Sequence, residues 1–255
     1  SPDKGQEWAE KGAEIVLFDY DKPDTLSTAM RGTDTLFLLT PFVEHFVPMV
    51  KSALGAAKEA GVKHIVRLSV VGSDPDAQGP PHQHGICDTL IKESGLDWTL
   101  IQPTFFQDNI LNFAADTIKH QGAIYGAAGD GKTAYVSAKD IASVSVAVLK
   151  APEKHIQQAY PLTGPEALSE YEVAAIVSEI TGKEVRYTNL TREHYIGGMK
   201  HNQLPEWMIQ YMTALEDIKA NGWAAGLADG VQKVTGQAPR GMRAYLTEQK
   251  HRLTS

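Results

Sequence analysis

The side chains best suited to chemistry in this sequence are His84 and Asp88, four residues apart where a helix over residues 87–93 is predicted to begin. Because a histidine titrates near neutral pH, His84 could orient a substrate or donate a proton to it. Two other interpretations stay open. His84 could cap the helix or contact the neighbouring carboxylate, and His82, His84 and Asp88 could suggest a metal site. We expect no metal, because no second cluster of ligands accompanies them.

The elements that would position these side chains alternate between helix and strand, a pattern typical of a parallel sheet with helices on both faces. Glycines follow several of the predicted helices, as at Gly12, Gly32 and Gly61. The predicted helices cover residues 3–11, 24–31, 48–60, 87–93, 112–120, 139–149, 170–180 and 206–221. The predicted strands cover residues 14–18, 35–39, 63–69, 98–101 and 135–136. The sequence therefore predicts an α/β fold with a doubly wound parallel sheet.

From Tyr160 onward the pattern changes to short strands and longer amphipathic helices. This change predicts a small α+β lobe at the carboxy-terminal end, packed over the open edge of the sheet. Pro152 marks a surface joint, so we expect a first domain over residues 1–152 and a lobe over residues 153–255. Large side chains in that lobe suit either a substrate pocket or a plain helical core. They are Tyr187, Tyr195, Trp207, Met208 and Tyr211.

Composition excludes several classes of protein. The chain has 255 residues and a formal net charge of -7, which argues against a surface that binds nucleic acid, because such surfaces need clustered Lys and Arg. Its single cysteine, Cys87, cannot form an intrachain disulfide and indicates a reducing compartment, so we expect the cytoplasm. No apolar run approaches the roughly 20 residues of a membrane span, so we expect no membrane partner.

Three segments resemble a known family: residues 95–109 (GLDWTLIQPTFFQDN), 126–132 (GAAGDGK) and 162–169 (LTGPEALS). In the first, a glycine stop, a buried strand and a polar-aromatic loop follow one another without a spacer. Together the segments resemble the NmrA-like branch of the atypical short-chain dehydrogenases, over nearly the whole chain. The resemblance implies a Rossmann domain that holds NAD(P)(H).

The resemblance also implies a function. It favours an NAD(P)H-dependent oxidoreductase that passes hydride to a small molecule such as a quinone, an azo dye or a triphenylmethane dye. The alternative is a non-catalytic dinucleotide sensor that acts through protein partners, as in the NmrA regulators, and the fold alone cannot separate the two. A homodimer also stays open.

The resemblance places cofactor contacts at the carboxyl ends of the strands. Asp19 and Tyr20 match the segment beside adenine, although Asp19 could instead cap the next helix. Residues 39–42 match the segment beside the ribose and pyrophosphate, or form an ordinary strand exit. Residues 103–109 match the segment around the nicotinamide, although the two phenylalanines there could equally be core aromatics. The complete set of expected contacts is Asp19, Tyr20, Leu39, Thr40, Pro41, Phe42, Ser69, Pro103, Thr104, Phe105, Phe106, Gln107, Asp108 and Asn109.

The resemblance implies catalytic residues less directly. Ser69 ends its strand where short-chain dehydrogenases often keep a Ser or Thr near the reacting carbon, but no Tyr-x-x-x-Lys follows it. Residues 80–88 are similar to the family's His-x-x-x-Glu, with Asp88 in place of Glu. This similarity makes His84 a catalytic candidate beside Ser69. Gln102 stands where the family often has Arg, so anionic substrates are expected to be less favoured.

The glycine loop G-x-x-G-x-x-G, which carries the pyrophosphate in such domains, is missing from the sequence. The family has this loop before the point at which Ser1 stands, so we expect roughly 30–45 natural residues upstream of Ser1, with a true short form as the alternative. Without the loop, the chain as given is expected to bind a dinucleotide weakly. The position that selects NAD or NADP also lies before Ser1. Lys4 is the only nearby cation, and the resemblance implies an Arg immediately upstream, so NADP(H) is favoured, with NAD(H) as the alternative.

Overall fold

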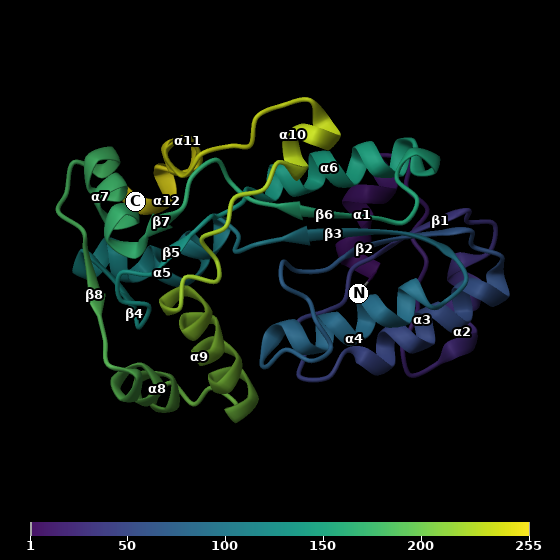
Figure 1. The fold of residues 1–255 in the computed structure, drawn as a ribbon, viewed down its shortest axis with the longest axis horizontal. Coiled ribbons are helices and arrows are strands. Elements are labelled where there is room, and N and C mark those ends of the chain that lie inside the picture. Colours follow the sequence, from purple (N-terminus) through teal and green to yellow (C-terminus); the bar gives the residue numbers. More distant parts are fainter. Residues whose placement is uncertain (1, 255) are drawn as a thin grey trace.

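A four-stranded parallel sheet forms the centre of the computed structural model, which describes residues 2–254 (Figure 1). The strands follow the order β1, β2, β3, β6, and each neighbouring pair is parallel. Strand β2 is buried along most of its length, as expected for a sheet covered on both faces. The strands are β1 (Thr35–Leu38), β2 (His64–Leu68), β3 (Asp97–Pro103) and β6 (Gln158–Leu162).

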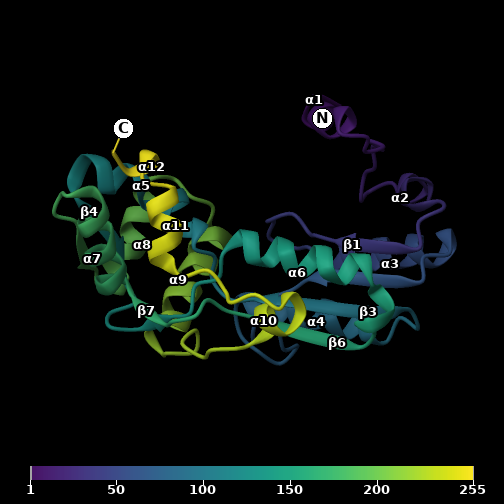
Figure 2. The same cartoon turned by 90° about the horizontal axis from the view of Figure 1, so that it is seen from above.

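Helices cover both faces of this sheet, as the alternation of elements predicts (Figures 1 and 2). On one face, α2, α3 and α4 pack over a cluster that includes Ile65 and Ile91. On the other face, α6 and α10 pack over a cluster that includes Val66 and Val144. The helices are α2 (Pro23–Met30), α3 (Val47–Ala60), α4 (Pro80–Lys92), α6 (Ala138–Lys150) and α10 (Gly230–Thr235). The prediction of a doubly wound α/β fold is therefore confirmed.

The strand expected over residues 14–18 is wrong. These residues form no strand and lie open to solvent, with Leu17 64% and Phe18 51% exposed. The parallel sheet ends at β1, so the backbone of this segment has no neighbouring strand with which to exchange hydrogen bonds. Before it, α1 (Pro2–Glu10) stands clear of the sheet (Figure 2). Side chains are described from residue 5 onward, except at residue 23, so the side chain of Lys4 lies outside the described residues.

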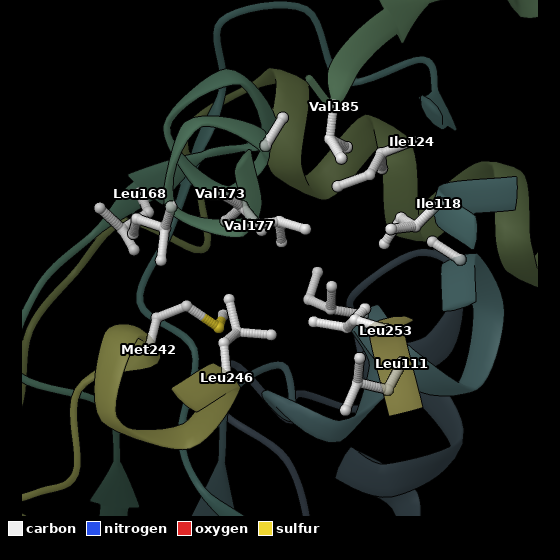
Figure 3. Close-up of a cluster of buried hydrophobic side chains, with 14 of the residues drawn as sticks. Leu111, Ile118, Ile124, Leu168, Val173, Val177, Val185, Met242, Leu246 and Leu253 are labelled. Atoms are coloured by element: carbon white, nitrogen blue, oxygen red, sulfur yellow. The ribbon is translucent and has the colours of Figure 1, made fainter. Parts of the chain in front are cut away.

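A smaller lobe lies beside the carboxyl ends of the sheet strands (Figure 1). It contains a parallel pair of strands, β4 and β8, and an antiparallel pair, β5 and β7. Its core joins side chains that are far apart in the sequence, among them Leu111, Val177 and Leu246 (Figure 3). The elements of the lobe are α5 (Asp108–Gln121), β4 (Ala123–Gly126), β5 (Lys132–Thr133), β7 (Leu168–Ser169), α7 (Glu170–Thr181), β8 (Arg186–Asn189), α8 (Arg192–His201), α9 (Glu206–Ala220), α11 (Met242–Glu248) and α12 (His251–Thr254).

The chain passes between the sheet and the lobe more than once. Helix α5 and strand β4 precede residue 152 yet pack in the lobe, whereas β6 and α10 follow it and pack with the central sheet. A single boundary at residue 152 therefore does not describe the packing. The strand expected at residues 135–136 is displaced as well, because β5 lies at Lys132–Thr133 and Val136 makes an isolated bridge to Phe106.

Gly85 of α4 offers a test of how closely the preceding loop packs on this helix. A Cβ atom there would lie 2.0 Å from the carbonyl carbon of Asp74, so Gly85→Ala should cost about 1–3 kcal/mol of unfolding free energy, the usual range for overpacking. Gly55 of α3 is the matched control, since a Cβ atom there meets nothing within 4 Å. Gly55→Ala should instead stabilise by about 0.5–1 kcal/mol. Urea unfolding measures both changes in unfolding free energy. Equal changes for the two variants would contradict the close packing of the loop on α4.

Candidate active site

A groove of about 450 Å³ opens at the carboxyl ends of β1 and β2, where doubly wound sheets bind their ligands. Residues of α4 and α9 form its other walls. Its volume is ordinary for a small-molecule site. It brings together seven of the expected site residues: Leu39, Thr40, Pro41, Phe42, Ser69, His84 and Phe106.

A buried ion pair borders this groove. Arg67 of β2 has no exposed area, and its Nη1 lies 2.5 Å from Oδ1 of Asp88 on α4. The other carboxylate oxygen of Asp88 accepts 2.6 Å hydrogen bonds from the hydroxyls of Ser69 and Ser73. Buried charges need such partners, because an unpaired charge is costly to desolvate. Arg67 is not among the residues expected from the sequence, although a charged residue inside the largely apolar run HIVRL is the signal that marks it.

His84 reaches the groove in a fixed tautomer. Its Nδ1 lies 3.2 Å from Nη2 of Arg67, and because a guanidinium only donates, Nδ1 accepts and the proton sits on Nε2. Burial, followed by the charge of Arg67, lowers the pKa of His84 to about 3. His84 is therefore a neutral hydrogen-bond donor at physiological pH. This state favours the expected role in orienting a substrate over proton donation by an imidazolium.

Ser69 belongs to the same network. Its buried hydroxyl donates to Asp88, and a serine hydroxyl has only one proton. Toward a ligand Ser69 therefore keeps only the capacity to accept a hydrogen bond. The structure places Ser69 at the groove, and its catalytic role stays a prediction.

Asp19 and Tyr20 make contacts in the turn before α2 and do not line the groove. The Asp19 carboxylate accepts a 3.0 Å hydrogen bond from the backbone nitrogen of Asp21 and lies 3.5 Å from Nζ of Lys22. Tyr20 packs edge-on against Phe18, with the ring centroids 5.3 Å apart. The alternative that Asp19 caps the next helix is wrong, because Lys22 is the N-cap of α2 and no side chain caps that helix; contact of Asp19 with adenine stays a prediction.

The two phenylalanines after β3 point to different parts of the molecule. Phe106 lines the groove. Phe105 packs instead against Tyr135 in the lobe, with the ring centroids 6.3 Å apart. The alternative of a core aromatic therefore describes Phe105, and contact of Phe106 with the nicotinamide stays a prediction.

Gln107 and Asp108 hold this segment to the carboxy-terminal residues of the lobe. The fully buried side chain of Gln107 donates at 2.7 Å to the backbone carbonyl of Arg240. The Asp108 carboxylate accepts a 3.3 Å hydrogen bond from the hydroxyl of Tyr245. Direct contact of the segment with a cofactor stays a prediction. The remaining expected contacts lie outside the groove lining, and they are Pro103, Thr104 and Asn109.

An aromatic wall closes the groove on the side of α9. The ring centroid of Phe42 lies 5.2 Å from that of Trp207 and 5.0 Å from that of Tyr211. Phe42 is 56% exposed, so it still presents a face to a ligand. The large side chains expected to suit a substrate pocket are thus divided, because Trp207 and Tyr211 line the groove while Tyr187 is buried in the core of the lobe.

Within residues 2–254 the structure gathers no group of three potential metal ligands. None of the helices in that range combines the length and the apolar character needed to cross a membrane.

Residues 2–234 match the NmrA-like family, and the chain therefore belongs to that family. Among its relatives, the NAD(P)H azoreductase of Xenophilus azovorans is 39% identical over 241 residues, which cover 93% of this chain and 82% of that protein. Quinone oxidoreductase 2 of Escherichia coli is 30% identical over 222 residues, which cover 87% of this chain and 77% of that protein.

Solved structures share the fold. The NADPH complex of an NADPH-dependent quinone oxidoreductase from Escherichia coli superposes with a TM-score of 0.90 and 25% identity, covering 98% of this chain and 88% of that chain. The NADP(H) complex of the triphenylmethane reductase from Citrobacter sp. superposes with a TM-score of 0.85 and 23% identity, covering 98% and 87% of the two chains. The Rossmann-type fold implied by the resemblance is confirmed.

Removing one partner of the Arg67–Asp88 pair should be costly. Asp88→Ala leaves the guanidinium buried without a counter-charge, and we expect a loss of about 3–5 kcal/mol in unfolding free energy. The control is Asp34, which pairs with Lys63 at 2.7 Å where both side chains are exposed. Asp34→Ala should leave the melting temperature nearly unchanged, because exposed ion pairs contribute little. A similar melting temperature for the two variants would contradict this account of the buried pair.

His84 should make stability depend on pH. Its pKa is about 3 in the folded protein against a reference value of 6.5, so the unfolded chain binds this proton at a higher pH than the folded chain does. The contribution to stability is therefore complete above the reference value and is lost as the pH falls toward the folded value, by up to about 1.4 kcal/mol per pH unit. His84→Gln should flatten this slope in urea unfolding at a series of pH values. The exposed His45→Gln control should not, and an unchanged slope in both variants would refute the assignment.

Proposed function

We propose that this chain is an NAD(P)H-dependent oxidoreductase that transfers hydride to a quinone, an azo dye or a similar conjugated acceptor. The observation that carries the proposal is the groove at the carboxyl ends of β1 and β2, walled by Phe42, Trp207 and Tyr211. Conjugated acceptors are flat and apolar, and they stack well on aromatic side chains. The azoreductase and the quinone oxidoreductase among the relatives support the same class of acceptor.

The groove suits part of a dinucleotide, since residues 39–42 match the family segment beside the ribose and pyrophosphate and Phe106 belongs to the segment around the nicotinamide. It lies at the edge of the sheet where such cofactors bind. The side chains of Leu39 and Phe42 line it, and each is more than half exposed, so both offer apolar surface to a ligand. Residues 39–42 would hold the cofactor, with Phe106 beside them. The bound nicotinamide supplies the hydride. The NADPH and NADP(H) complexes of the related structures support NADP(H), and NAD(H) is the alternative.

The protein itself contributes orientation. The Nε2–H group of His84 is suited to donate a hydrogen bond to the oxygen or nitrogen atom that the acceptor presents. Arg67 holds the imidazole through Nδ1, and the ring of Phe46 packs against it with the centroids 4.9 Å apart. A donor fixed in this way needs no reorganisation when negative charge develops on the acceptor.

Trp207→Leu tests the aromatic wall. With NADPH and a panel of quinones and azo dyes, this variant should raise the KM for the acceptor roughly fivefold to tenfold, because one aromatic contact is lost. Its melting temperature should change little. Trp223 is the matched control, since it is 70% exposed and lies outside the groove lining.

Two outcomes would count against this function. An equal change in KM for Trp207→Leu and Trp223→Leu would remove the aromatic wall from the site. Tight NADPH binding without oxidation of NADPH by any acceptor in the panel would favour the non-catalytic sensor instead.

A further inference from the structure

A second cavity lies within the lobe, separate from the groove. It holds about 140 Å³ and is bounded by residues of α5, β4 and α9. Among the described residues, none lines both spaces. On helix α9, Tyr211 lines the groove and the next residue, Met212, lines the cavity; the segment after β3 divides in the same way between Phe106 and Phe105.

Apolar side chains form most of the cavity wall, among them Phe105, Ile110 and Leu215. Phe113 of α5 also lines it and is 67% exposed, so a large apolar surface stands uncovered at this place. An apolar cavity of about 150 Å³ is known to accept a benzene molecule. This cavity therefore has the size and the lining for a single aromatic ring.

Charged side chains lie at the other end of the cavity. The Nζ atom of Lys219 lies 2.8 Å from Oε1 of Glu170 and 3.0 Å from Oε1 of Glu216. The hydroxyl of Tyr135 donates to the same Oε1 atom of Glu170 at 2.6 Å. The Oε2 atom of Glu216 accepts a 2.6 Å hydrogen bond from the backbone nitrogen of Ala127. The polar groups of this end are thus bound to one another, with one exception.

The exception is Oε2 of Glu170, which is buried and has no hydrogen-bond partner among the described residues. Glu170 is 4% exposed and lines the cavity. Leaving a buried carboxylate oxygen unsatisfied costs free energy, since the atom gives up its hydrogen bonds to water and gains none in return. A ligand that donates a hydrogen bond here would complete the contacts of this carboxylate.

The charge of the cluster favours a cationic donor. Two carboxylates face one ammonium group, which leaves one negative charge in excess. Burial alone would lower the pKa of Lys219, but its neighbours, Glu170 and Glu216 among them, raise this pKa well above its usual value. Lys219 therefore stays charged and balances one of the two carboxylates. Burial raises the pKa of Tyr135, which therefore stays neutral.

We propose that this cavity binds a primary amine carried on a single aromatic ring, with the ring between the apolar walls and the ammonium group donating to Oε2 of Glu170. An alcohol of the same shape would form a weaker, uncharged hydrogen bond, and a carboxylate would be repelled. The site uses no part of the groove, so its occupation can be measured without cofactor or acceptor.

Titration calorimetry with three probes of similar shape tests the ligand class: benzylammonium, benzyl alcohol and benzoate. Benzylammonium should bind at least about tenfold more tightly than benzyl alcohol, and benzoate should not bind, because a charge-assisted hydrogen bond is stronger than a neutral one. Equal affinities for the three probes, or no measurable binding of benzylammonium, would overturn the proposal.

Variants of the same protein test the place of binding. Ala114 lines the cavity and is buried, so Ala114→Met should fill the space and abolish benzylammonium binding. Ala142→Met on the exposed face of α6 is the matched control and should leave binding unchanged. Glu170→Gln should remove the preference for benzylammonium over benzyl alcohol. If Glu170→Gln fails to fold, the Ala114→Met pair and the probe series still decide the matter, and unchanged binding in Ala114→Met would refute the site.

Discussion

The ion pair between Arg67 and Asp88 is the interaction on which the groove depends. It joins β2 to α4, and the arrangement of the surrounding polar groups follows from it. Asp88 fixes the hydroxyls of Ser69 and Ser73, while Arg67 fixes the tautomer of His84. A buried pair adds little net stability, because desolvation offsets much of the attraction. Its effect here is geometric, since one arrangement of strand and helix satisfies all of these groups at once.

The same pair sets the electrostatic character of the groove. Because Asp88 compensates the charge of Arg67, the groove presents a neutral donor, His84, beside apolar walls. Gln102, where the family resemblance leads us to expect Arg, donates a 3.0 Å hydrogen bond to Ser73 and so belongs to the same network. The expectation that anionic substrates are less favoured stays a prediction.

Local patterns predicted most of the fold. The end of a helix at a glycine could be predicted because a glycine such as Gly61 adopts the left-handed backbone conformation that other residues disfavour. The strand at residues 14–18 failed because an apolar run describes a strand only when a neighbour pairs with it. The interleaving of sheet and lobe also depends on contacts between distant segments, and no local pattern encodes them.

The site was predicted in the same uneven way. Residues 39–42 and Ser69 end or follow predicted strands, so the topology of a parallel sheet places them at one edge, whereas His84 on α4 was expected from the family resemblance. Arg67 was missed because its importance lies in a partner 21 residues away in the sequence. The division between Phe105 and Phe106 also escaped prediction, since it depends on which neighbour each ring meets.

Helix α9 separates the groove from the cavity in the lobe and serves both. Because an α-helix turns by about 100° per residue, consecutive positions on it point in different directions, and Tyr211 lines the groove while Met212 lines the cavity. Substitutions on one face can reshape one chamber while leaving the chemistry of the other intact. Residues on the two faces of α9 can therefore be substituted independently, so that the groove and the cavity can evolve separately although they share one helix.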